Sequence, residues 1–279
     1  MAYKTILVHV DESTHAPGRI EVAARLALEN EAHLIGAATS GMSRTLYRAA
    51  AFSVENPDIE SWVQMLHDQA EAALDRFESI ARQAGLASFE RRLVDDEAVS
   101  GISLQARYAD LVVLGQEDPD EIAYSTNPGF PGQVIMAAGC PALVIPYAGS
   151  FPVIGHKILL AWNASMEARR TVHYALPLLA RAQSVNVAVF NPSPGRNDHG
   201  EQPGADLALY LARHNIKVNV VQRTTDINVG AALLALADDF DADLIAMGCY
   251  GHPRVREVLL GGATRTILQS MSLPVFMAH

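Results

Sequence analysis

The stretch TILVHVDES, residues 5–13, has the pattern of a buried strand that ends in an acid and leads into a helix. KILLAWNAS at 157–165 repeats that pattern 152 residues further along the chain, and NVAVF at 186–190 follows LIGAA at 34–38 by the same offset. A strand-to-helix step that recurs in order along a chain indicates duplication of one structural unit. The sequence therefore predicts two copies of the same α/β unit.

Two later blocks continue the repeat with a smaller offset of 133 residues. ARYADLVVLG at 106–115 corresponds to DDFDADLIAMG at 238–248, and CPALVIP at 140–146 to LPVFMAH at 273–279. The second copy is thus shorter between its second and fourth strands. The Gly- and Pro-bearing connector at 148–155 marks the junction. We expect domains at 1–150 and 151–279.

Each copy alternates strand-like and helix-like segments. The expected strands of the first copy are continuous apolar runs, as in a parallel sheet buried on both faces, and lie at 4–10, 33–39, 88–94, 110–115 and 141–146. An apolar helical stripe runs from Ile59 to Ile80 and ends before Gly85, a plausible C-cap. The fold class expected is α/β: two tandem doubly wound domains, each a five-stranded parallel sheet flanked by helices.

Composition narrows the classes of function. A formal net charge of −10 provides no overall positive field for a nucleic-acid backbone, so no nucleic-acid partner is expected. Two cysteines are too few for a disulfide framework and fit the cytoplasm. The start MAYKTILVHVDES lacks the pattern of a signal peptide, and no apolar run reaches about 18 residues, so no membrane association is expected.

A glycine-spaced loop follows the fourth strand of the second copy. In MGCYGHPRVREVLLGGATRT, residues 247–266, two residues separate Gly248 from Gly251 and nine separate Gly251 from Gly261. Gly262 then opens a helix. Glycines let a backbone approach a ligand closely, and a helix N-terminus presents unpaired N–H groups to an anion. The carboxyl ends of parallel strands are also where such sheets bind ligands.

With its repeat and this loop, the whole chain resembles a tandem member of the universal stress protein family. Nucleotide-binding members carry Gly-x2-Gly-x9-Gly-Ser/Thr after the fourth strand. The resemblance implies a Rossmann-like domain that binds ATP, or ADP or AMP, in the second copy, with magnesium held only through the phosphates. The site residues it implies are Asn163, Val189, Gly248, Gly251, Arg254, Gly261, Gly262, Ala263 and Thr264.

Within that set, the adenine is expected near the strand ends carrying Asn163 and Val189, and the phosphates on the backbone of 251–263. The sequence departs from the family pattern at two positions. Gly262 stands where ATP binders have Ser or Thr, so one hydroxyl donor is missing. Asn163 stands where the family usually has Asp, and an amide accepts hydrogen bonds without a charge.

The first copy has lost the phosphate half of this site. Gly115 corresponds to Gly248, but Asp118 replaces Gly251 and Pro128 replaces Gly261. Its acidic loop residues oppose a polyphosphate by Coulomb repulsion and are Glu117, Asp118, Asp120 and Glu121. Pro128 and Pro131 lack N–H donors. Although Asp11 keeps the acid at the strand end, we expect one nucleotide site per chain, in the second domain.

Other residues receive ordinary structural interpretations. Cys249 and His252 have Cys-x-x-His spacing but no second ligand pair, so neither is assigned to a metal. Cys140 and His9 are expected to be packed in the core. Ser13, Ser165 and Asn228 are expected to be helix N-caps. No catalytic residue is assigned, because neither a Walker A motif nor a nucleophile elbow is present.

The function favoured by the sequence is nucleotide sensing in a cytoplasmic stress response, with at most slow hydrolysis. One alternative is a nucleotide-free scaffold that binds an unknown protein partner through its sheet edges and residues 40–58. Another is a hydrolase or ligase on the same fold. By resemblance to family assemblies, the last strands at 141–146 and 274–278 are expected to pair in an internal pseudo-dimer. A further homodimer is left open.

Overall fold

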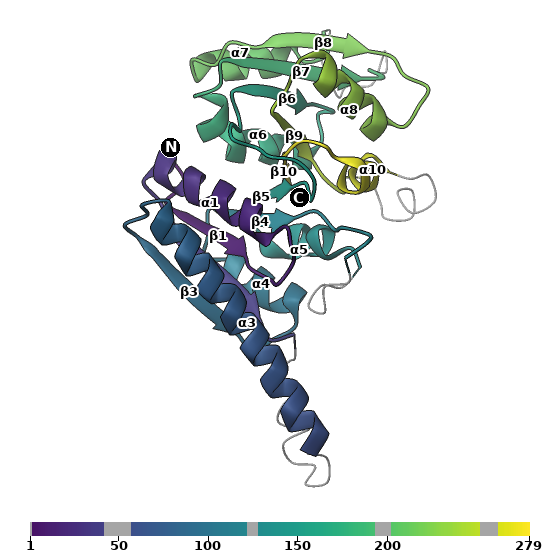
Figure 1. Cartoon of the computed structure of the whole chain (residues 1–279). Helices are drawn as coiled ribbons and strands as arrows, with labels where there is room; N and C mark the ends of the chain where they lie inside the picture. The colour runs from purple at the N-terminus through teal and green to yellow at the C-terminus, as the bar shows by residue number, and fades with distance from the viewer. Residues whose placement is uncertain (1, 42–56, 122–127, 193–201, 252–261) are drawn as a thin grey trace. The chain divides into compact units, whose positions relative to one another are not determined.

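The computed structural model describes residues 2–41, 57–121, 128–192, 202–251 and 262–279 (Figure 1). By its contacts the chain separates into two units, Ala2–Cys140 and Pro141–His279. Both alternate strands with helices, and the strands are mostly parallel. The α/β fold class expected from the sequence is confirmed.

The N-terminal unit contains four parallel strands in the order β3-β2-β1-β4. Leu7, at the centre of the sheet, lies opposite Ile35 on one side and Val112 on the other, and all three are buried. Contacts join α1 to α3 and α4 to α5. The elements are β1 (Thr5–His9), α1 (Ala16–Asn30), β2 (His33–Thr39), α3 (Pro57–Gln83), β3 (Phe89–Val94), α4 (Ala98–Ala106), β4 (Leu111–Gly115) and α5 (Phe130–Ala138).

Helix α3 packs on this sheet through a close approach at Gly36. A Cβ at Gly36 would lie 2.5 Å from the ring of Phe77, so a side chain on this part of β2 would displace the helix. The expected C-cap is also present, because Gly85 has a φ of 78° and its N–H donates to the carbonyl of Arg82 at 3.0 Å. Glycine adopts this left-handed conformation without the steric cost of a Cβ.

The described residues of the C-terminal unit form six strands in the order β5-β10-β9-β6-β7-β8. All of its neighbouring pairs are parallel except β5 with β10. In Figure 1 it runs from teal to yellow. Its elements are β5 (Ala142–Ile145), β6 (Lys157–Ala161), α6 (Met166–Leu179), β7 (Ser184–Phe190), α7 (Ala205–Arg213), β8 (Asn219–Arg223), α8 (Val229–Asp239), β9 (Leu244–Gly248), α10 (Ala263–Ser270) and β10 (Val275–Ala278).

Strand β5 determines where the two units divide. It is antiparallel to β10, with Leu143 opposite Phe276 and Val144 opposite Val275. By its contacts β5 groups with the C-terminal unit, which begins at Pro141, and the domain boundary expected at 150/151 stays a prediction. The pairing of the two last strands is the contact on which the expected pseudo-dimer rests. The pseudo-dimer itself stays a prediction.

The expected helix N-caps have different outcomes. The side chain of Ser165 accepts from the N–H of Ala168 at 3.2 Å, and that of Asn228 accepts from the N–H of Gly230 at 2.8 Å, so both are confirmed. The N-cap expected at Ser13 is wrong, because α1 begins at Ala16 and its N-cap is His15. Proline is favoured in the first helical turn, where its missing N–H has no helical partner, and Pro17 thus places the start after Ser13.

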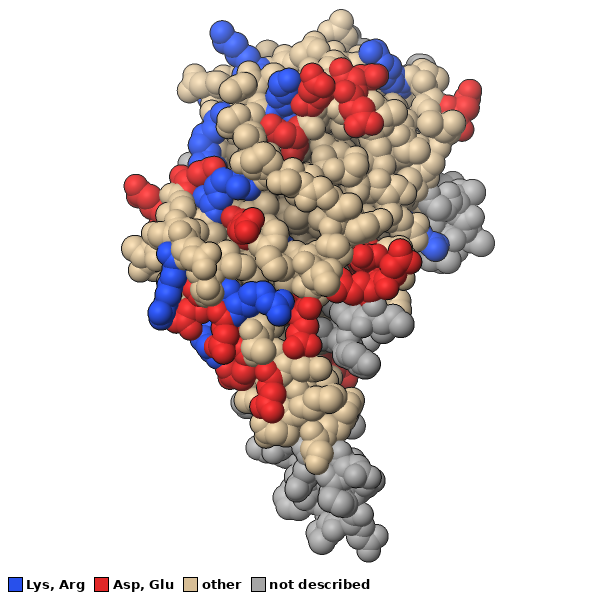
Figure 2. All heavy atoms as spheres, in the orientation of Figure 1, with Lys and Arg blue, Asp and Glu red and all other residues tan. Residues whose placement is uncertain are grey.

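Of the two residues expected in the core, His9 is buried and Cys140 is only partly buried. His9 is 1% exposed, and burial raises the pKa of the Cys140 thiol to about 12, which keeps it protonated. Basic side chains on the face shown in Figure 2 form separate patches among acidic ones. Among the described helices, none combines the length and apolar character needed to cross a bilayer.

Candidate nucleotide site

The C-terminal unit contains a pocket of about 520 Å³ at the carboxyl ends of β6, β7 and β9. Small-molecule sites usually fall between about 300 and 1,000 Å³. One wall is apolar and belongs to Ala161, Trp162, Ala188, Phe190, Leu233 and Met247. Two aromatic side chains at adjacent strand ends provide faces on which a planar ring can lie. This part of the pocket suits a flat, largely apolar group.

Three helices of the described part of the chain begin at this pocket, and described side chains cap two of them. Ser165 caps α6 and Asn228 caps α8. Helix α10 begins after Gly262, and no side chain of the described residues caps it. Gly262, Ala263 and Thr264 line the pocket, so the first turn of α10 faces it. Uncapped N–H groups and the positive end of the helix dipole favour an anion at this position.

Two contacts hold the loop after β9 close to these helices. A Cβ at Gly248 would lie 2.6 Å from the backbone carbonyl carbon of Glu167, so only glycine allows this approach of β9 to α6. The hydroxyl of the buried Thr264 accepts from the N–H of Tyr250 at 3.3 Å. Its own proton can still be donated to a ligand.

The structure brings together six of the nine residues assigned from the sequence. Those that line the pocket are Asn163, Gly248, Gly251, Gly262, Ala263 and Thr264. Asn163 is exposed, and its side-chain oxygen accepts from the N–H of Ser165 at 3.1 Å. The fully buried Val189 does not line the pocket; its neighbours Ala188 and Phe190 do. Arg254 and Gly261 lie outside the described residues. Ligand contact at each of these positions stays a prediction.

Several pocket residues were not assigned from the sequence. Trp162, Phe190 and Tyr250 all lie at the ends of strands or directly after them. Their position at the carboxyl edge of a parallel sheet was the available signal, since ligands bind there. Asn228 was recognised only as an N-cap, although the helix that it caps also borders the pocket.

In the N-terminal unit, a side chain of the protein binds the helix N-terminus that corresponds to the start of α10. Helix α5, which corresponds to α10, already has an anion at its N-terminus: the carboxylate of Glu117 accepts from the N–H of Phe130 at 2.8 Å. The second proline expected to remove a donor, Pro131, lies in the same first turn. The protein's own side chain thus occupies the position that α10 leaves open.

The strand-end acid of the first copy is also paired within the protein. Asp11 is 8% exposed, and its carboxylate lies 2.9 Å from the guanidinium of Arg19. Burial would raise the pKa of Asp11, but the positive charge of Arg19 outweighs this and holds the pKa well below its usual range. In the second copy, Thr171 stands at the position of Arg19 and bonds to the carbonyl of Glu167 at 2.9 Å. The carboxylate of Asp11 is therefore held in an ion pair with Arg19.

Comparison with known proteins agrees with this geometry. The family model described as the universal stress protein family matches residues 155–279, which contain the whole pocket. Over these residues the chain is similar to the universal stress protein family. The universal stress protein Slr1230 of Synechocystis is 22% identical over 216 residues, which cover 75% of this chain and 71% of that protein.

Solved structures extend the likeness in fold to both halves. A universal stress protein from Archaeoglobus fulgidus superposes with a TM-score of 0.74 at 16% identity, covering 98% of this chain and 95% of the other. A functionally unknown protein from Pseudomonas aeruginosa superposes with a TM-score of 0.62 at 15% identity, covering 99% and 92%. The universal stress protein fold therefore runs through the tandem chain.

Proposed function

We propose that the C-terminal unit binds one adenine nucleotide, ATP or the related ADP or AMP, and that the protein acts as a nucleotide sensor in the cytoplasm. The observation that carries this proposal is the start of α10, which no described side chain caps, at the edge of a pocket of about 520 Å³. It provides an anion position next to an apolar wall. A nucleotide has the same two parts, a flat base and a charged phosphate group.

The first copy supports this placement by comparison. There, Glu117 provides a carboxylate to the N-terminus of α5. The corresponding residue of the second copy is Tyr250, which carries no charge, so this position supplies no carboxylate to α10 and leaves its N-terminus to a ligand anion. The described pocket residues include no carboxylate. Magnesium is therefore expected to enter with the phosphates rather than to bind a cage of protein ligands.

Mass spectrometry of the molecules released from purified, denatured protein tests the proposal. We expect an adenine nucleotide, or, for protein that has lost its ligand, uptake of added ATP in preference to GTP. A protein that releases no nucleotide and takes up no ATP would contradict the proposal and favour the scaffold alternative. Release of inorganic phosphate from bound ATP at a steady rate would favour the hydrolase alternative.

Gly262→Ser should strengthen ATP binding. Gly262 has a φ of −55°, which any residue adopts, so the change introduces no backbone strain. The added hydroxyl restores the donor that nucleotide-binding family members carry, and one hydrogen bond is worth roughly 1 kcal/mol, or about fivefold in Kd. Titration calorimetry with ATP measures the change. Weaker binding would mean that the serine caps α10 itself, in competition with the phosphate.

A further inference from the structure

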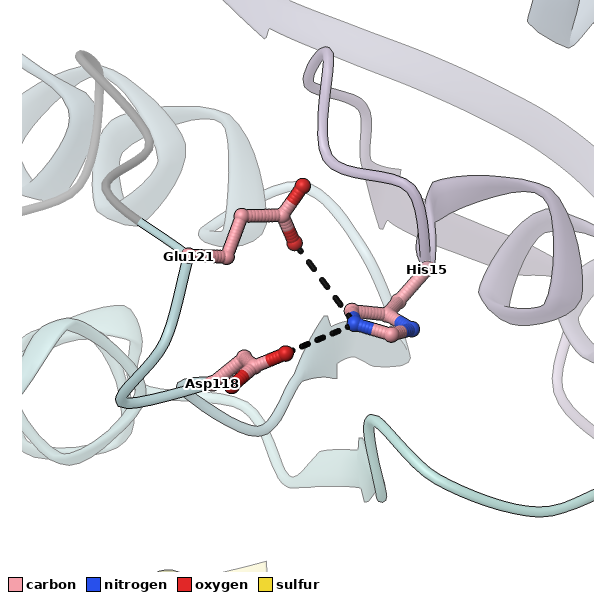
Figure 3. Close-up of side chains that lie close together, drawn as sticks. All are labelled: His15, Asp118 and Glu121. Atoms are coloured by element: carbon pink, nitrogen blue, oxygen red, sulfur yellow. Dashed lines mark hydrogen bonds and ion pairs between the residues drawn. The ribbon is translucent and has the colours of Figure 1, made fainter.

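We propose that the N-terminal unit binds a divalent transition-metal cation of the Zn²⁺ class through His15, Asp118 and Glu121. These side chains come from two separate segments, the end of the β1–α1 connection and the loop after β4, and they point toward one another (Figure 3). They lie outside the nucleotide pocket, which belongs to the other unit. This proposal does not depend on nucleotide binding.

The spacing of the three ligand atoms fits a single small ion. His15 Nε2 lies 2.9 Å from an oxygen of Asp118 and 3.6 Å from an oxygen of Glu121, and all three ligand atoms lie within 4.8 Å of one another. Zinc bonds of about 2.0–2.2 Å in a tetrahedron place neighbouring ligands about 3.4 Å apart. Small side-chain adjustments therefore suffice to close the ring of ligands around one ion.

The backbone already holds both carboxylates in place. The other oxygen of Asp118 accepts from the N–H of Asp120 at 2.9 Å, and the other oxygen of Glu121 accepts from the N–H of Thr14 at 2.8 Å. Such outer contacts fix the direction of metal ligands and lower the cost of ordering them. The bond from Thr14 also ties the two segments together beside His15.

The donor set selects a class of metal. One imidazole nitrogen with two carboxylate oxygens suits Zn²⁺ and its neighbours in the transition series, whereas Mg²⁺ and Ca²⁺ prefer oxygen ligands alone. Two carboxylates neutralise the charge of a divalent ion. The three side chains are between 17% and 34% exposed, so the ion can enter from solvent and complete its coordination with water.

A hollow of about 290 Å³ adjoins this cluster, and Glu121 is part of its lining. Thr39, which also lines it, is 6% exposed, and its hydroxyl has no hydrogen-bond partner among the described residues. A buried hydroxyl without a partner costs free energy unless water or a ligand satisfies it. The site therefore has room beside it for a group bound to the ion.

The second copy lacks all three ligands at the corresponding positions. His15 corresponds to Glu167, Asp118 to Gly251 and Glu121 to Arg254. The loop that presents glycines to a phosphate in one copy thus presents carboxylates in the other, with a histidine opposite them. Carboxylates that repel a polyphosphate attract a cation at the same place. The two copies then have opposite ligand preferences.

Titration of the chelator-treated full chain with Zn²⁺, followed by calorimetry, tests this proposal. We expect one zinc site per chain, with Mg²⁺ and Ca²⁺ binding far more weakly. His15→Gln and Asp118→Asn should each weaken zinc binding by at least about tenfold, since even loss of an outer-shell partner commonly costs 10–100-fold. Circular dichroism of both variants establishes that they are folded.

Asp120→Asn is the matched control, because it removes one carboxylate from the same loop without removing a ligand, and the backbone N–H of residue 120 remains. It should bind zinc as the unchanged protein does. Cobalt offers a second readout, since loss of the imidazole should alter the visible spectrum of bound Co²⁺. Failure to bind zinc, or equal binding by the unchanged chain and His15→Gln, would overturn the proposal.

Discussion

Replacing Tyr250 with glutamate should abolish ATP binding, with a loss of at least about 100-fold in affinity. The substitution gives the second copy the residue that the first has in Glu117, whose carboxylate accepts from the N-terminus of α5. A carboxylate at the start of α10 would take the N–H groups offered to the phosphates and repel the phosphate charge. Like charges placed together at a binding site cost several kcal/mol, and 1.4 kcal/mol is tenfold.

Tyr250→Gln is the control for this variant. Glutamine matches glutamate in size and has no charge, and both side chains lose the ring of tyrosine equally. Tyr250 has a φ of 55°, which is equally unfavourable for either replacement, so any strain cancels in the comparison. Titration calorimetry should show binding by the glutamine variant well above that of the glutamate variant. Equal affinities would show that the start of α10 is not the phosphate position.

Lowering the pH from 6.5 to 4 should reduce the free energy of unfolding by about 3 kcal/mol through His9 alone. Burial lowers the pKa of His9 from 6.5 to about 4; the carboxylate of Asp11 opposes this shift, and the charge of Arg19 adds to it. Between these values the unfolded chain binds a proton at this histidine that the folded protein does not. Stability therefore rises with pH across this window.

Denaturant unfolding at several pH values between 4 and 6.5 measures this effect. The slope due to His9 approaches 1.4 kcal/mol per pH unit near the centre of the window. His9→Gln removes the titrating group, and its stability should depend less on pH than that of the unchanged protein. Parallel curves for the two proteins would show that His9 titrates alike in the folded and unfolded states.

The sequence predicted the fold because its signals are local and occur twice. Continuous apolar runs such as LVVLG, residues 111–115, favour a strand covered on both faces, and the repeat supplied an independent check on them. The order of the strands was not predicted, because the right-handed crossover rule sets the hand of each connection and not which strands become neighbours. The pairing of β5 with β10 was expected only from the resemblance to family assemblies, because a pairing so distant along the chain leaves no mark on the composition of the connector.

The polar half of the candidate site was visible in the sequence, and the apolar half was not. Glycines at fixed spacing indicate a backbone that closely approaches a ligand or another element, as Gly248 approaches the backbone of α6. In the sequence, Phe190 and Trp162 look like ordinary residues at strand ends. They line the same pocket because β6 and β7 are neighbours in the sheet. Val189, the residue before Phe190, was assigned from the resemblance and does not line the pocket, and its contact with a ligand stays a prediction.

The clearest gap concerns the first copy. Its acidic loop was interpreted only as incompatible with phosphate. Two specific ion pairs of this copy were not predicted, because the sequence does not show which side chains lie close together in space. Arg19, in the first turn of α1, forms an ion pair with Asp11. His15 contacts Asp118, although the two residues are 103 positions apart in the sequence. Comparison of the copies gave the available signal, since Arg19 replaces Thr171 and His15 replaces Glu167. Charged substitutions in one copy of a repeat indicate a new partner nearby.

Stoichiometry is the most direct test of the central claim that nucleotide binding is confined to the C-terminal unit. Calorimetric titration of the full chain with ATP should give one site per chain, lost in Tyr250→Glu and retained in Asp11→Asn. One site lost on changing Asp11, or two equal sites per chain, would contradict the account.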